Sequence, residues 1–281
     1  MDNSHNNKFT GPLKAVIFDW AGTTVDFGCF APTGVFQEVF RLKGIEITIE
    51  EARGPMGMHK RDHIRTISQY ARVATEWQKK YGSECLEADV EDMFTSFIPM
   101  QLAVIEKYAD IVPELPDAII VVRNMGMKIG STTGYNNEMM NLLTAAAARQ
   151  GYVADSVVCA TDVPAGRPAP WMAFKNAENL GIYPMHAILK IGDTIADIEE
   201  GLNAGMWSVG IIMSSNEMGL TLAEIAEMSA TDLESLKNTV RERYLKAGAH
   251  FVIENLGEIE NLINTINERL SQCKNPGRRY F

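Results

Sequence analysis

The sequence predicts an α/β fold: a doubly wound parallel sheet, Rossmann-like in character, with an all-helical domain inserted into it. Three observations support this prediction. Short β-branched apolar runs recur along the chain, helix-like segments separate them, and one long helical stretch interrupts the alternation directly after the first run.

The apolar runs end in polar or glycine-rich turns, which is typical of buried parallel strands that deliver side chains to the carboxyl edge of a sheet. The expected strands are 13–20, 128–134, 156–162, 186–194, 207–215 and 250–254. Helical segments such as 136–151 and 195–206 lie between them and close near a glycine that can end a helix. Strand and helix therefore alternate as a doubly wound sheet requires.

The stretch from Gly28 to Tyr108 breaks this alternation. Its apolar residues recur with helical spacing, and it contains no convincing buried strand. We therefore expect an α/β core domain formed by residues 1–27 and 109–281, and a helical cap domain formed by residues 28–108. An insertion at the carboxyl end of the first strand can fold back over the edge where such sheets bind ligands.

Composition narrows the possible functions. The chain has 281 residues, 46% of them hydrophobic, and a net charge of -10, which disfavours binding to nucleic acid or to an anionic membrane surface. No apolar run is long enough to cross a bilayer, and the polar first eleven residues lack the apolar centre of a secretory signal. Four scattered cysteines show neither zinc nor disulfide spacing, so we expect a cytoplasmic protein.

Polar residues that could carry chemistry follow four of the expected strands. They are Asp19 in DWAGTT, Thr133 in GSTTGY, Arg167 in VPAGRPAP, and Asp193 and Asp197 in GDTIAD. Each alone has an ordinary structural explanation, as a helix N-cap, a turn residue or a surface charge. Because all of them occur at predicted strand ends, a shared site is the better interpretation, and its carboxylates suit a hard cation such as Mg²⁺.

This order of motifs resembles the haloacid dehalogenase superfamily over the whole predicted core. The resemblance implies that Asp19 is a nucleophile towards phosphorus and that Arg167 neutralises phosphoryl charge. It implies phosphoryl-oxygen contacts from Thr133, Gly22 and Thr23. It also implies Mg²⁺ binding by Asp19, the Ala21 carbonyl and Asp193, with Asp197 supporting the metal shell.

Ala21 departs from the superfamily pattern. Phosphatases of this superfamily usually have a second aspartate at this position, which protonates the leaving oxygen and then activates water. An alanine cannot move a proton, so an ordinary phosphate monoesterase is disfavoured. Either the activity is lost or the leaving group is not an alkoxide.

A motif in the expected cap domain favours a leaving group other than an alkoxide over a loss of activity. The segment PMGMHKRDHIR places Lys60 and His63 on one face at the start of a helix. Together with the core motifs, it resembles the phosphonatase family, the phosphonoacetaldehyde hydrolases. That resemblance implies that Lys60 forms a Schiff base with the substrate and that Cys29 lies near the site. It offers two roles for His63: proton transfer together with Tyr135, or packing of the helix. We expect Met56 to be an apolar lining residue of the site.

The implied reaction is hydrolysis of the carbon–phosphorus bond of phosphonoacetaldehyde to acetaldehyde and phosphate. A carbon leaving group needs an acceptor for its electrons, and an iminium on Lys60 provides one. The amine must be neutral to form it, either because it is buried or because Arg61 and Arg65 lie near it; the sequence does not decide between these causes.

Two alternatives remain open. The chain could be a phosphatase or phosphomutase of the same superfamily acting on a small phosphate ester, with Lys60 only binding anions. It could also be a degenerate core that serves as a binding module, although the retained Asp19, Thr133, Arg167 and Asp193 speak against this. The family resemblance further implies a homodimer through the caps, for which the apolar stripe of PTGVFQEVFRLKG is a candidate.

Overall fold

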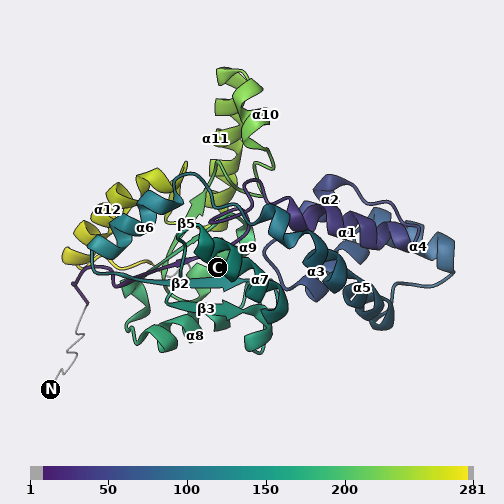
Figure 1. The fold of residues 1–281 in the computed structure, drawn as a ribbon, viewed down its shortest axis with the longest axis horizontal. Helices are drawn as coiled ribbons and strands as arrows, with labels where there is room; N and C mark the ends of the chain where they lie inside the picture. Colours follow the sequence, from purple (N-terminus) through teal and green to yellow (C-terminus); the bar gives the residue numbers. More distant parts are fainter. Residues whose placement is uncertain (1–8, 278–281) are drawn as a thin grey trace.

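A computed structural model describes residues 9–277, so most of the polar leader lies outside the described residues. All six predicted strands are present and form one parallel sheet in the order β3-β2-β1-β4-β5-β6 (Figure 1). Their bounds are β1 Ala15–Phe18, β2 Lys128–Thr133, β3 Ser156–Cys159, β4 Ile188–Gly192, β5 Trp207–Ile211 and β6 Phe251–Ile253. The predicted doubly wound fold is confirmed, because the order reverses at β1 and places β2 and β4 on either side of it.

Helices cover both faces of this sheet, which explains why β1 is buried along its whole length. Ala15 and Ile17 face one side and pack with α8 (Trp171–Leu180). The alternate residues Val16 and Phe18 belong to the main core with apolar residues of three further helices. These are α6 (Leu115–Asn124), α7 (Asn137–Arg149) and α12 (Ile259–Ser271).

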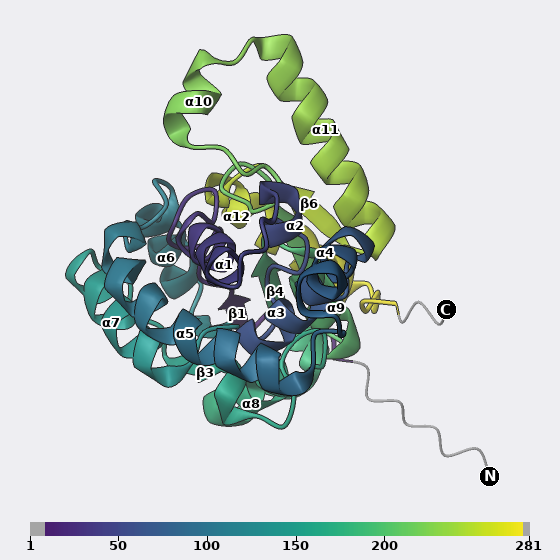
Figure 2. The same cartoon turned by 90° about the vertical axis from the view of Figure 1, so that its right-hand side faces the viewer.

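The chain from Ala31 to Tyr108 consists of helices and short connections. It forms α1 (Ala31–Leu42), α2 (Ile49–Arg53), α3 (Lys60–Ser68), α4 (Ala71–Tyr81), α5 (Glu87–Ile105) and the short η1 (Glu106–Tyr108). Figures 1 and 2 show these helices gathered in one group beyond the sheet. Buried Phe36, Ile64 and Phe97 join α1, α3 and α5 in the apolar core.

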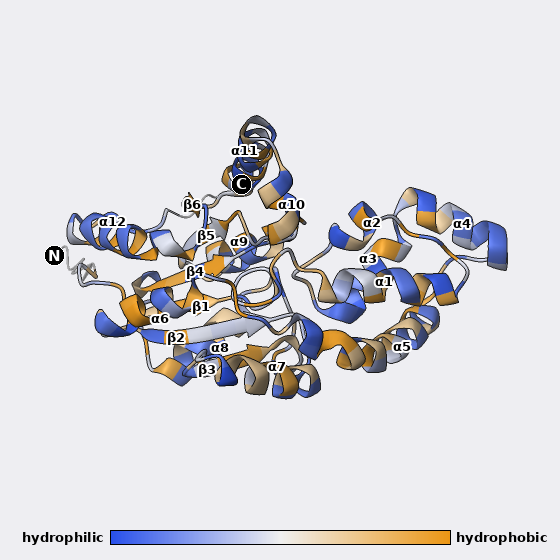
Figure 3. Ribbon diagram, turned by 45° about the horizontal axis from the view of Figure 1, so that its top comes forward, coloured by the Kyte–Doolittle hydropathy of each residue, from blue (hydrophilic) through white to orange (hydrophobic). Residues whose placement is uncertain are grey.

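The remaining helices follow β4 and β5. They are α9 (Ile195–Asn203), α10 (Leu222–Glu227) and α11 (Ala230–Ala247). Helices α10 and α11 project from the core as a hairpin (Figure 2). The outer helices α4 and α11 carry many hydrophilic residues, whereas β1 and β4 are hydrophobic (Figure 3). Within residues 9–277, no helix has the length and apolar character needed to cross a membrane.

Candidate active site

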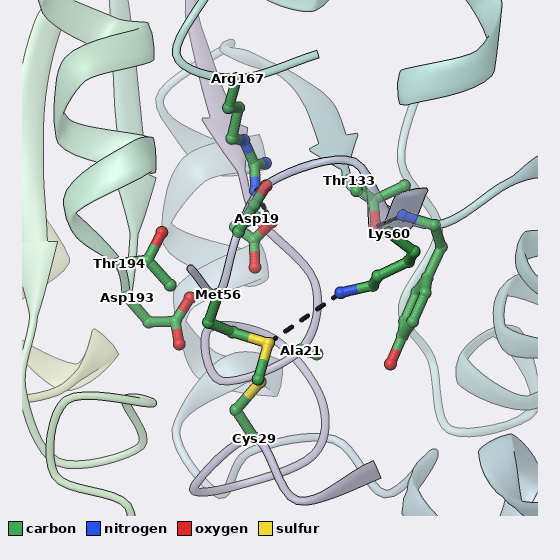
Figure 4. A pocket seen from close by; sticks show the side chains of 12 residues that line it. Asp19, Ala21, Cys29, Met56, Lys60, Thr133, Arg167, Asp193 and Thr194 are labelled. Carbon is green, nitrogen blue, oxygen red and sulfur yellow. Dashed lines mark hydrogen bonds and ion pairs between the residues drawn. The ribbon is translucent and has the colours of Figure 1, made fainter. Parts of the chain in front are cut away.

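The carboxyl ends of neighbouring strands bring the predicted site residues together. Asp19 follows β1, Thr133 ends β2 and Asp193 follows β4, and these three strands are direct neighbours. A small pocket lies at these strand ends (Figure 4). The pocket is lined by Asp19, Ala21, Cys29, Met56, Gly57, Lys60, Thr133, Gly134, Tyr135, Arg167, Asp193 and Thr194. It therefore joins residues from the core with residues from the helical segment.

Three buried carboxylates form an acidic cluster at this pocket. One oxygen each of Asp19, Asp193 and Asp197 lies within 4.8 Å of the others. Burial, reinforced by the neighbouring carboxylates, raises the pKa of Asp193 well above its usual value. Burial also raises the pKa of Asp19, although Arg167 opposes the shift. Because carboxylate oxygens are the donors that a hard cation binds, this cluster suits a metal ion.

Asp197 differs from the other two carboxylates. Burial alone would raise its pKa, but Arg167 and Lys190 bring it below the usual value. Lys190 Nζ lies 2.6 Å from Asp197 Oδ1, and Arg167 Nη2 lies 3.1 Å from the same oxygen. Thr194 Oγ1 donates to the other oxygen at 2.6 Å. Asp197 is thus held by two cations and a hydroxyl, and it does not line the pocket. This agrees with a position behind the residues that could bind a metal ion.

Arg167 faces the nucleophile candidate. Its Nη1 lies 2.7 Å from Asp19 Oδ1, and both side chains are almost fully buried. Thr133 lines the same pocket and accepts a hydrogen bond from the Tyr135 backbone N–H at 3.1 Å. A guanidinium, a hydroxyl and a carboxylate thus converge on one small volume, as capture of a phosphoryl group requires.

Lys60 enters this pocket from the helical segment. It is the first residue of α3 and is only 6% exposed. Its Nζ lies 4.0 Å from Met56 Sδ and 4.9 Å from the centre of the Tyr135 ring. Figure 4 shows the amine pointing into the pocket, on the side of Asp19 and Met56. Burial in these surroundings lowers the pKa of Lys60, although Cys29 and Asp19 oppose the shift.

Arg61 and Arg65 do not lie near the Lys60 amine. Arg61 pairs with Glu91 at 2.6 Å, and Arg65 pairs with Glu87 at 2.6 Å. These ion pairs lie on the α5 side, partly exposed. Burial is therefore the main cause that lowers the Lys60 pKa, and Arg167 is the cation that adds to it.

The turn before α3 lies directly on the core. Gly57 has φ +89°, and a Cβ built on it would lie 2.4 Å from Thr194 Oγ1. A Cβ on Gly134 would lie 2.4 Å from the Met58 carbonyl oxygen. Arg167 Nη1 also donates to the Gly57 carbonyl at 3.4 Å. Glycine at both positions allows the two backbones to approach and close the pocket.

His63 is buried but does not line the pocket. Its Nε2 donates to the Ala52 carbonyl at 2.8 Å, and its ring stacks on Phe36 with centroids 3.7 Å apart. Its Nδ1 has no hydrogen-bond partner among residues 9–277. Burial, with Lys60 nearby, lowers the pKa of His63 well below its usual value, so the imidazole is neutral.

The other predicted residues divide into two groups. Cys29, Met56 and Tyr135 line the pocket with Ala21. Gly22 and Thr23 lie behind Asp193 instead: Thr23 Oγ1 donates to Asp193 Oδ1 at 3.4 Å. These two residues therefore support the acidic cluster, and in this arrangement they do not reach the pocket.

Sequence reasoning missed several residues of the site. Gly57, Gly134 and Thr194 line the pocket, and fully buried Lys190 and Glu200 lie behind it. A signal for Lys190 was available, because a lysine within the apolar run HAILKIG has no place in a doubly covered strand without a buried partner. The packing glycines carry no such signal, since their partners are distant in sequence.

Comparison with known proteins identifies the family. The family model of haloacid dehalogenase-like hydrolases matches residues 13–205. Phosphonoacetaldehyde hydrolase of Bacillus cereus strain G9842 is 47% identical over 257 residues, which are 92% of this chain and 97% of that protein. The chain belongs to the phosphonoacetaldehyde hydrolase family of haloacid dehalogenase-like hydrolases. The resemblance predicted from the motifs is confirmed.

Other relatives support this placement. A phosphonoacetaldehyde hydrolase-like protein of Syntrophobacter fumaroxidans is 46% identical over 274 residues, covering 97% of this chain and 99% of the relative. The crystal structure of a phosphonoacetaldehyde hydrolase-like protein from Oleispira antarctica matches with a TM-score of 0.95 and 38% identity, covering 98% of this chain and all of that one. A β-phosphoglucomutase from Clostridium difficile, at 19% identity and a TM-score of 0.66, shares the fold alone.

Proposed function

We propose that this protein hydrolyses the carbon–phosphorus bond of phosphonoacetaldehyde to acetaldehyde and phosphate. The observation that carries the proposal is the buried Lys60 amine in the same small pocket as Asp19 and Arg167, with alanine at position 21. The names of the relatives, at 46–47% identity, agree with this activity.

The reaction begins at Lys60. The neutral amine adds to the aldehyde carbon, one proton is taken up and water leaves, which gives a protonated imine. Desolvation of the amine lowers its pKa and so increases the fraction that is neutral. Met56 and the Tyr135 ring surround the amine and exclude water around the imine.

Asp19 then attacks phosphorus in line. The carbon–phosphorus bond breaks, and its electrons move into the imine to give a neutral enamine and an aspartyl phosphate. Protonation of the enamine carbon and addition of water release acetaldehyde from Lys60, and a second water releases phosphate from Asp19. One water is formed and two are consumed, so the net reaction uses one water.

Other residues bind and orient the phosphoryl group. Arg167 and Thr133 hold its oxygens, while Asp19, Asp193 and the Ala21 carbonyl would hold Mg²⁺ with Asp197 behind them. Bound Mg²⁺ neutralises phosphoryl charge. The alanine at position 21 has no proton to give, which fits a leaving group whose electrons go to the imine.

We assign His63, Cys29 and Tyr135 to the surroundings of the amine. Neutral His63, one helical turn from Lys60, stacks on Phe36 outside the pocket, so we assign it a packing role behind the amine rather than proton transfer. Gln101 Nε2 donates to Tyr135 OH at 3.5 Å, which holds the ring beside Lys60. Burial raises the pKa of Cys29 well above its usual value, so it acts as a small neutral lining residue.

We also propose that residues 28–108 act as a cap domain over a core of residues 1–27 and 109–281. The support is the contact of the turn at Gly57 with Thr194, together with the helical group in Figure 1. Opening of this contact would admit substrate, and closing it would bury Lys60. All four cysteines are free, which agrees with the reducing cytoplasm as the location.

The proposed homodimer forms through the caps. An apolar groove along α1 and the end of α5 is lined by Phe30, Ala31, Gly34, Val35, Glu38, Met100, Val104 and Tyr108. A second copy would cover it. Val104→Glu should convert a dimer to a monomer in sedimentation experiments, whereas Ile120→Glu, on the exposed face of α6, should not. A monomeric wild-type protein would refute the dimer.

The test of the activity is a product assay. Purified protein with Mg²⁺ should release acetaldehyde and phosphate in equal amounts from phosphonoacetaldehyde, and Lys60→Arg should release neither. Faster turnover of a small sugar phosphate would favour the phosphatase or phosphomutase alternative. Binding of a protein partner without release of either product would favour a non-catalytic module.

A further inference from the structure

Behind the pocket lies a buried group that the proposed mechanism does not use. Glu200, on α9, is fully buried and faces the Arg167 side chain. Its Oε2 lies 2.9 Å from Arg167 Nε, 3.0 Å from Thr132 Oγ1 and 3.6 Å from Lys190 Nζ. Neither Glu200 nor Thr132 lines the pocket. Their shortest contacts towards the pocket are with Arg167, which does line it.

The contacts of the guanidinium divide between its two sides. On the side away from the pocket, Nε donates to Glu200, and Nη2 donates to Thr132 Oγ1 at 2.5 Å and to the Thr132 carbonyl at 2.8 Å. On the pocket side, Nη1 lies 2.7 Å from Asp19 Oδ1. Because the guanidinium is planar and rigid, fixing Nε and Nη2 fixes the direction of Nη1.

Thr132 connects the two partners of Arg167. Its hydroxyl accepts from Nη2 and donates to Glu200 Oε2, so the three side chains close a ring of hydrogen bonds. Thr132 also precedes Thr133 on β2, which ties this ring to the strand that carries the phosphoryl-binding hydroxyl. The ring therefore fixes the position of the Arg167 side chain relative to Thr133.

The burial of Glu200 is costly, which favours a functional reason for it. Its Oε1 has no hydrogen-bond partner among the described residues. A buried carboxylate with one oxygen unsatisfied is poorer for stability than an apolar side chain of similar volume. A carboxylate is nevertheless the group that holds a guanidinium Nε most firmly.

We propose that Glu200 and Thr132 are positioning residues that aim the Nη1 edge of Arg167 at the phosphoryl group. The inference rests on the proposed function only in taking Arg167 as the phosphoryl-binding cation. It assigns to two residues outside the pocket an influence on anion affinity that acts through Arg167. Glu199, the exposed neighbour of Glu200 on α9, provides a matched control of equal charge.

The experiment compares Glu200→Gln, Thr132→Val and Thr132→Ser with Glu199→Gln. Inorganic phosphate is titrated into each Mg²⁺-loaded protein by calorimetry, and kcat and KM are measured for phosphonoacetaldehyde. We expect Glu200→Gln and Thr132→Val to weaken phosphate binding about 10-fold to 100-fold, the range for a lost charge-assisted hydrogen bond. We expect Thr132→Ser, which keeps the hydroxyl, to restore most of the affinity and Glu199→Gln to match wild type.

Wild-type phosphate affinity in folded Glu200→Gln and Thr132→Val would overturn the inference, as would a wild-type protein that binds no phosphate. If circular dichroism shows that Glu200→Gln does not fold, the two Thr132 variants decide the question. The phosphate titration does not depend on turnover. A wild-type protein that binds phosphate but does not cleave phosphonoacetaldehyde would refute the proposed function, while the titrations would still test Glu200.

Discussion

Gly57→Ala is expected to impair closure of the pocket without unfolding the protein. The added Cβ would lie 2.4 Å from Thr194 Oγ1 and 3.2 Å from Ala196 Cβ. Thr194 cannot move away cheaply, because its hydroxyl caps α9 by accepting from the Asp197 N–H at 3.2 Å. The turn at position 57 therefore has to lift from the core or break this cap.

The size of the effect follows from these contacts. An alanine at φ +89° costs about 1 kcal/mol in backbone strain. Loss of the threonine cap costs about another 1 kcal/mol. Together, about 2 kcal/mol placed on the closed state predicts a decrease of about 30-fold in kcat/KM for phosphonoacetaldehyde.

A substitution at a second glycine is the control that distinguishes backbone strain from impaired closure of the pocket. Gly82, at the end of α4, has φ +73°, and a Cβ there would meet nothing within 4 Å. Gly82→Ala should lower the free energy of unfolding by about 1 kcal/mol and leave kcat/KM unchanged. The assay is acetaldehyde release, coupled to its enzymatic reduction, together with urea unfolding of each variant. Wild-type kcat/KM in Gly57→Ala would refute the claim that this contact is needed for turnover.

Three further predictions follow from other contacts. Arg53 Nη1 donates to the Gly28 carbonyl at 2.8 Å and to Asn216 Oδ1 at 3.1 Å, and the Asn216 N–H donates to Asp193 Oδ2 at 2.8 Å. Arg53→Met should therefore weaken Mg²⁺ binding about fivefold by calorimetry, and unchanged affinity would contradict this coupling. Because burial lowers the pKa of Lys60 in the folded state, the unfolded state binds more protons between that pKa and 10.5, and stability rises with pH over that range. Lys60→Met should thus stabilise the fold most near neutral pH and least near pH 10.5 in urea unfolding; a gain independent of pH would argue against a buried amine. Chelation of Mg²⁺ should abolish phosphate release and its return should restore the activity, whereas full activity in a chelator would contradict a role for the acidic cluster.

The sheet and most of the site could be predicted because their signals are local. Each strand is a short apolar run, and Asp19, Thr133 and Asp193 stand where such runs end. Parallel strands bring their carboxyl ends to one edge, so the convergence of these residues followed from topology alone. The alanine at position 21 was informative because a residue type was missing at a fixed spacing from Asp19.

The closure of the pocket could not be predicted in the same way. Gly57 and Thr194 are far apart in sequence, and nothing near either residue indicates the other. Helical spacing placed His63 on the side of Lys60, but stacking on Phe36 and the bond to Ala52 turn the ring away from the pocket. Side-chain direction of this kind depends on packing, which periodicity does not report.

The most direct test of the account is reductive trapping of the imine. Borohydride added during turnover of phosphonoacetaldehyde should inactivate the enzyme, and peptide mass analysis should find a two-carbon adduct on Lys60 alone. Borohydride without substrate should leave the enzyme active. Full activity after treatment with both reagents, or an adduct on a different lysine, would contradict the claim that Lys60 accepts the electrons of the broken carbon–phosphorus bond.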